Sequence, residues 1–156
     1  MIINFSDQPL SLSKKSIFLA GPTPRKKGIC SWRPEACKIL QSLGFDGVVY
    51  VPELSSQKVL FNYDNQIDWE WKALENAGIV IFWIPREMPD MPALTTNVEF
   101  GYYVRDSRTL YGRPDAAVLN QYLDRLYKRH HENMRIYNTL SELCKKGVEL
   151  LDIWDM

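Results

Sequence analysis

The feature that most constrains the fold is the continuous apolar run Gly78–Ile84, of sequence GIVIFWI, which Pro85 closes. A short run of this kind, rich in β-branched residues, is typical of a strand buried on both faces of a parallel sheet. It therefore predicts an α/β fold. The loop that follows such a strand lies at the carboxyl edge of the sheet, where open α/β folds bind their ligands.

Short strands and helices alternate along the rest of the chain. Further strands are predicted at Ile17–Ala20 and Val48–Val51, and a weaker one at Arg108–Tyr111, because each run meets glycine or proline soon after its end. Ile136–Tyr137 is a candidate last strand, and Met1–Lys15 can add an edge strand. Helices are predicted at Ser31–Leu43, Ile67–Ala77, from about Thr96, around Tyr122–Tyr127 and from the capping box Thr139-x-x-Glu142. This alternation predicts a single α/β domain over residues 1–156, with a mainly parallel sheet of about five strands flanked by helices.

Charge and cysteine content exclude several classes of protein. Nineteen basic and nineteen acidic side chains cancel, so the electrostatic signature of a nucleic-acid-binding protein is missing, and Arg25-Lys26-Lys27 is either a solvated loop or an anion contact. Cys30, Cys37 and Cys144 predict neither a disulfide framework nor a zinc site. No stretch has the length of a signal peptide's apolar core or of a membrane span, which predicts a cytoplasmic protein without a membrane partner.

Glu99 is the most conspicuous candidate for chemistry, because a strand and a loop precede it and a helix is predicted around it. One interpretation is structural: Thr96-x-x-Glu99 fits a capping box in the first turn of that helix. The other is a carboxylate nucleophile, which must be ionised to attack. The positive end of a helix dipole favours the ionised form in both cases.

An ordered set of short motifs resembles the nucleoside 2-deoxyribosyltransferase-like family. In chain order the motifs are Ile17–Arg25 (IFLAGPTPR), Ser31–Ala36 (SWRPEA), Trp69-Glu70, Phe82–Arg86 (FWIPR), Thr95–Gly101 (TTNVEFG), Tyr111–Asp115 (YGRPD) and Tyr122–Asp124 (YLD). Each motif alone is weak, whereas the ordered set covers most of the chain and is fairly specific.

The resemblance implies a flavodoxin-like domain that exchanges the base of a 2′-deoxynucleoside through a covalent deoxyribosyl-enzyme. Glu99 falls on the family's nucleophile, in the pattern Asn-x-Glu-x-Gly. Gly21, Pro22 and Arg25 fall on the first loop, which borders the nucleoside pocket. The family completes that pocket with a neighbouring subunit, so a homo-oligomer is expected. The chemistry needs neither a cofactor nor a metal.

Further acidic groups of the family are harder to align. Counting back from Ile79 places Glu70, or else Asp68, at the position of the family's acidic group that contacts the base or sugar. Alternatively, these two residues only supply favourable negative charge at the exposed start of a helix. Another family acid precedes the nucleophile. Here the loop is longer, so Asp90, Thr95 or Asn97 takes that place.

Tryptophans are candidates for walls against which a base stacks. Trp71 and Trp83 are expected in the core, because they lie on an apolar helix face and in a buried strand. Trp32 and Trp69 are open to either role, and they are taken as candidate substrate contacts.

These features predict a retaining transferase of 2-deoxyribose between purine or pyrimidine bases, whose partners are a deoxynucleoside and a free base. Glu99 is the predicted nucleophile, and Glu70 or Asp68 the acid or base-orienting group. Two alternatives stay open. One is an N-glycoside hydrolase of deoxynucleosides or their 5′-monophosphates, and the other is a non-catalytic nucleoside-binding module.

Overall fold

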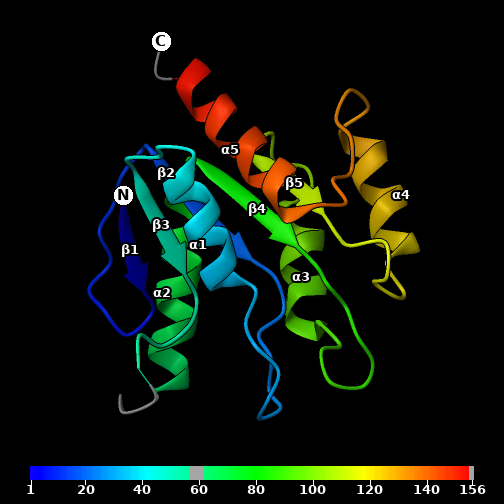
Figure 1. Cartoon of the computed structure of the whole chain (residues 1–156), viewed down its shortest axis with the longest axis horizontal. Helices are drawn as coiled ribbons and strands as arrows, with labels where there is room; N and C mark the ends of the chain where they lie inside the picture. The colour runs from blue at the N-terminus through cyan, green and yellow to red at the C-terminus, as the bar shows by residue number, and fades with distance from the viewer. Residues whose placement is uncertain (57–61, 155–156) are drawn as a thin grey trace.

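A computed structural model describes residues 1–56 and 62–154 of the chain. Its centre is an all-parallel sheet with strand order β1-β3-β2-β4-β5. The strands are β1 Ile2–Phe5, β2 Ser16–Ala20, β3 Val48–Val51, β4 Ile79–Trp83 and β5 Thr109–Gly112. The helices are α1 Arg33–Ser42, α2 Tyr63–Asn76, α3 Leu94–Tyr103, α4 Gln121–His130 and α5 Leu140–Trp154. The predicted flavodoxin-like α/β fold is confirmed (Figure 1).

Two hydrophobic cores cover the two faces of the sheet. Successive strand residues point to opposite faces, so Ile79 and Ile81 pack with α1 and α5, whereas Val80 and Phe82 pack with α2, α3 and α4. All five residues of β4 are buried. The double burial explains why this strand carries no alternating polar residues.

The strand order creates a crevice at one edge of the sheet. From β2 the chain crosses to β3 on one side and then returns, through α2, to β4 on the other side of β2. Ligands in open α/β folds bind beside the carboxyl ends of the strands at such a reversal. The fold thus brings the segments that follow β2, β3 and β4 together.

Most predicted elements are confirmed, and a few differ at their ends. β3 matches its prediction, β1 supplies the edge strand expected within Met1–Lys15, and the Thr139 hydroxyl caps Glu142 N at 3.3 Å. The candidate last strand at Ile136–Tyr137 is wrong: Tyr137 makes only an isolated parallel bridge to Gly112. Among the described helices, none is both long and apolar enough to span a membrane.

The beginning of α3 corrects an expectation about Glu99. The helix begins at Leu94, after Ala93 in a left-handed conformation (φ 57°), and no side chain caps it. Thr96 is therefore inside the helix, and Glu99 lies in its second turn. The capping-box interpretation is wrong, and the dipole at the helix start is too far away to be the main influence on the carboxyl group.

Candidate active site

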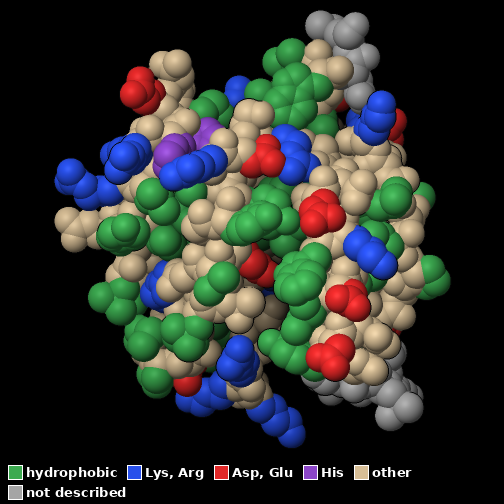
Figure 2. All heavy atoms as spheres, turned by 180° about the vertical axis from the view of Figure 1, so that it is seen from behind, with side chains coloured by type: hydrophobic (Ala, Val, Ile, Leu, Met, Phe, Trp, Pro, Cys, Tyr) green, Lys and Arg blue, Asp and Glu red, His purple; other side chains and the backbone are tan. Residues whose placement is uncertain are grey.

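A cavity of about 780 Å³ lies at the carboxyl edge of the sheet. It is lined by the loop after β2, the first residue of α1, the segment after β3, one side of α2, the loop after β4 and the first turns of α3. Its volume is within the range of small-molecule sites. Figure 2 views the face over α2 and α3, where hydrophobic side chains gather beside a hollow that holds an acidic side chain.

Glu99 lines this cavity from the second turn of α3. The pKa of Glu99 is raised to about 7, mainly by burial and also by the nearby charge of Glu70, while the charge of Arg33 acts in the opposite direction. Among the described residues, no hydrogen bond or ion pair holds the Glu99 carboxyl group. A carboxylate that is half-buried, lines a cavity and has no hydrogen-bond or ion-pair partner in the described part of the chain is available to a ligand.

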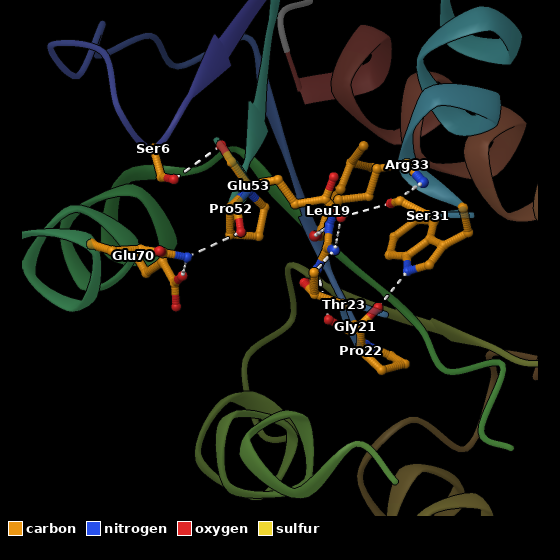
Figure 3. A network of polar contacts seen from close by, with 12 residues as sticks. Ser6, Leu19, Gly21, Pro22, Thr23, Ser31, Arg33, Pro52, Glu53 and Glu70 are labelled. Atoms are coloured by element: carbon orange, nitrogen blue, oxygen red, sulfur yellow. Dashed lines mark hydrogen bonds and ion pairs between the residues drawn. The ribbon is translucent and has the colours of Figure 1, made fainter. Parts of the chain in front are cut away.

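Glu70 lines the same cavity from α2. Its pKa is raised by burial, and a hydrogen bond from Gln66 and the charge of Arg33 act in the opposite direction. Gln66 Nε2 donates to Glu70 Oε1 at 2.8 Å and to the Pro52 carbonyl at 3.2 Å, which holds the glutamate in place (Figure 3). Two carboxyl groups that disfavour each other's ionisation within one cavity are typical of acid–base sites.

A comparison of the sequence with models of known families gave a match that includes the site. The model of the family described as "nucleoside 2-deoxyribosyltransferase like" matches residues 14–116, which include all the described residues that line the cavity. The chain belongs to this family. A search of curated proteins gave no match.

The nucleoside 2-deoxyribosyltransferase-like motif after β2 forms one wall of the cavity. Gly21, Pro22 and Arg25 line it, as does Thr23. Gly21 has a φ of 153°, and a Cβ at this position would clash with the Trp83 carbonyl oxygen and the Trp32 ring. Only glycine fits a backbone that passes so close to β4.

Three sequence-predicted contacts lie outside the cavity. Asp68 is on the exposed side of α2, so Glu70 alone of the two α2 candidates faces the site. Asp90 forms an ion pair with Lys26 at 3.2 Å, and Asn97 Oδ1 accepts from Arg86 Nη2 at 2.6 Å. Thr95 does line the cavity.

Of the four tryptophans considered, only Trp83 lies where it was expected. Trp32 and Trp69 are buried in opposite cores and do not line the cavity, which corrects their prediction as stacking walls. Trp71 is 60% exposed and lines the cavity, so its predicted core position is wrong. Trp83 is buried as expected.

Sequence analysis assigned no role to two buried arginines. Arg33 is 1% exposed and binds the loop after β2. Arg86 donates to the Pro92 carbonyl, Asn97 Oδ1 and Asn120 Oδ1, and so fixes the loop that leads into α3. Both occur in the family motifs SWRPEA and FWIPR, and this was their only sequence signal.

No group of three or more His, Cys, Asp or Glu side chains that could hold a metal ion occurs within the described part of the chain.

Proposed function

We propose that this protein transfers 2-deoxyribose between purine or pyrimidine bases, with Glu99 as the nucleophile. The observation that carries the proposal is the Glu99 carboxyl group itself, which is half-buried in a cavity of nucleoside size, lies in the same cavity as a second carboxyl group, and has no hydrogen-bond or ion-pair partner among the residues that the structure describes. Membership of the nucleoside 2-deoxyribosyltransferase-like family supports the same chemistry.

The reaction has two displacement steps at C1′. In the first, a Glu99 oxygen forms a bond to C1′ as the C1′–N bond breaks, and the base leaves with the bonding electrons and takes a proton from solvent while the Glu70 carboxylate orients it. In the second, another base attacks C1′ and loses a proton to solvent as the Glu99 ester breaks. Two inversions give net retention. The negative charge of Glu99 also stabilises the oxocarbenium-like transition state.

We expect turnover to rise with pH through about 7, because burial raises the pKa of Glu99 to about 7 and only the ionised form attacks. The kcat/KM profile for a deoxynucleoside checks this. Replacing Glu70 with glutamine removes the charge that opposes ionisation of Glu99, so the acid limb should move to lower pH. An acid limb near pH 4 in the wild type, or one unmoved by Glu70→Gln, would contradict the assignment.

Two aromatic side chains that line the cavity affect whether water reaches the covalent intermediate. Trp71 and Tyr63 line the cavity, and both are largely exposed. The described part of a single copy therefore leaves these two side chains exposed to solvent at the site, whereas transfer requires that water be kept from the ester. A homo-oligomer in which a second copy covers this side meets that requirement.

The outer face of α3 supports such an interface. Leu94, Val98 and Tyr102 follow one another at helical spacing and are 67%, 75% and 79% exposed, and the first two also line the cavity. An exposed apolar stripe of this kind marks an interaction surface.

We expect Val98→Lys to convert a homo-oligomer to monomers, because a charge in the interface would be left unpaired. Multi-angle light scattering checks this. Leu12→Lys, on an exposed apolar residue outside the cavity lining, is the matched control and should leave the oligomer unchanged. A fully active wild-type monomer would contradict the interface.

Incubation with deoxyinosine and excess adenine tests the proposed function. Chromatography should show deoxyadenosine and hypoxanthine in excess over free deoxyribose, with slow hydrolysis when adenine is omitted. Free sugar as the main product at saturating adenine would instead indicate the hydrolase. Saturable binding without any loss of deoxyinosine would indicate a binding module.

A further inference from the structure

Arg33 is an arginine with almost no exposed surface, and it belongs to the lining of the cavity. It follows the β2–α1 loop and begins α1, and four hydrogen bonds leave its guanidinium (Figure 3). Nε donates to the Leu19 carbonyl at 2.9 Å, and Nη2 to the Gly21 carbonyl at 2.6 Å. Nη1 donates to Thr23 Oγ1 at 2.9 Å and to Glu53 Oε1 at 2.7 Å.

These bonds join three segments that the sheet order brings together. Leu19 is in β2, Gly21 and Thr23 form the first wall of the cavity, and Glu53 follows β3. The Ser31 hydroxyl also donates to Glu53 Oε1, at 2.6 Å. A lysine has no planar fork with which to bind so many oxygens at once.

We propose that Arg33 is a positioning residue of this site: it fixes the Gly21–Thr23 wall through its hydrogen bonds and, from an almost fully buried place in the cavity lining, sets the charge environment of the Glu70–Glu99 pair. The second part of this inference rests on the proposed function, since Glu99 must be ionised to act as nucleophile. The first part rests on the hydrogen bonds alone.

One consequence concerns the Thr23 hydroxyl group. Thr23 Oγ1 accepts the Arg33 hydrogen bond, so its own hydrogen is directed away from Arg33. Thr23 is exposed and lines the cavity, and its hydroxyl is therefore available as a donor to a ligand oxygen.

The second consequence concerns ionisation within the cavity. Arg33 lowers the pKa of both Glu99 and Glu70, against the burial that raises them. Its partner Glu53 holds the Arg33 guanidinium through an ion pair at 2.7 Å. In the described part of the chain, the other titratable or charged groups around the site are Cys37 on α1, Arg25 on the first loop, Tyr63 on α2 and Tyr103 on α3.

Two variants separate the charge of Arg33 from its geometry, and neither measurement needs a substrate. In Arg33→Met, the Glu99 carboxyl signal in carbon-13 NMR should titrate at a higher pH than the wild-type value of about 7. In Arg33→Lys, which keeps the charge, this midpoint should stay near its wild-type value. The NMR order parameters of the Gly21 and Thr23 amides should fall in Arg33→Lys, because the fork that binds the loop is lost.

Arg108→Met is the matched control. Arg108 likewise binds a carboxylate, Asp106, and several backbone carbonyls, but it lies at the opposite end of the sheet, before β5. Its removal should lower stability and leave both the Glu99 midpoint and the loop order unchanged.

The results for the Arg33 variants can be interpreted whether or not the proposed function is correct. Unchanged order parameters in Arg33→Lys would overturn the positioning role, even if Arg33→Met failed to fold. An unchanged Glu99 midpoint in a folded Arg33→Met would overturn the electrostatic role. Both results hold whether or not the wild type exchanges bases. In active protein, Thr23→Val should raise KM several-fold at nearly unchanged kcat, and Thr23→Ser should restore KM.

Discussion

Replacing Glu99 with glutamine is expected to reduce turnover by several orders of magnitude, because the amide keeps the size of the side chain but cannot form the ester at C1′. The measurement is single-turnover release of hypoxanthine from deoxyinosine. Glu75→Gln is the matched control, since Glu75 is an exposed glutamate on α2 outside the cavity lining, and it should retain full activity. Near-normal turnover by Glu99→Gln would remove the basis of the mechanism.

The same substitution should make the folded state more stable above neutral pH. The pKa of Glu99 is about 7 in the folded protein, against an ordinary value of 4.5, so burial favours the protonated form. The contribution of Glu99 to stability is therefore complete below about pH 4.5 and is lost as the pH rises through 7. Glutamine cannot ionise, so the variant should gain on the order of 3 kcal/mol over the wild type at pH 8. Denaturant unfolding at pH 4 and pH 8 checks this.

Gly21→Ala is expected to have the second large effect. The new Cβ would meet the Trp83 carbonyl oxygen, and φ at this position is 153°. Neither the strand nor the buried Trp32 ring can move without disturbing a core, so the variant should lose about 3 kcal/mol or more, together with activity. Thermal unfolding followed by circular dichroism is the measurement.

Gly101→Ala is the control for this substitution. Gly101 lies in α3, has open space where its Cβ would be, and needs no special backbone conformation. Alanine in a helix is favoured over glycine by about 0.5–1 kcal/mol, so the variant should be as stable as the wild type or slightly more so. A Gly21→Ala protein as stable as Gly101→Ala would show that the loop after β2 has another conformation.

The strands could be predicted from sequence because a strand that is buried on both faces of the sheet is a short apolar run, and these runs end at glycine or proline. Which side of α2 packs against the sheet could not be predicted from sequence. Trp71 and Leu74 have helical spacing, and so do the residues that form the buried face, Trp69 and Ala73. Trp69 and Trp71 are two positions apart and therefore point in different directions on the helix. Only packing against β2 and β3 decides between them.

The start of α3 depends on contacts that are distant in sequence. Arg86 binds the Pro92 carbonyl and Asn97, and the chain enters the helix through a left-handed Ala93 without a side-chain cap. A local pattern therefore favoured Thr96 as the cap. Glu99 was nevertheless identified as the main candidate, because a strand and a loop precede it and the family motif surrounds it.

Arg33 was missed for a related reason. In sequence it is one of many basic residues, and nothing near it in the chain indicates burial. Its partners Leu19, Thr23 and Glu53 come from β2 and from the segments after β2 and β3, which only the parallel sheet brings together. Positioning groups of this kind follow from topology rather than from spacing.

In the proposed mechanism, Glu99 carries the sugar between the two half-reactions. Mass spectrometry of the quenched enzyme tests this role of Glu99 most directly. Wild-type protein mixed with deoxyinosine and quenched in acid before the steady state should carry one deoxyribosyl group, on the peptide that contains Glu99. Adding excess adenine before the quench should remove this group as deoxyadenosine appears. A deoxyribosyl group on any other residue, or base exchange by a protein that never carries the sugar, would contradict the account.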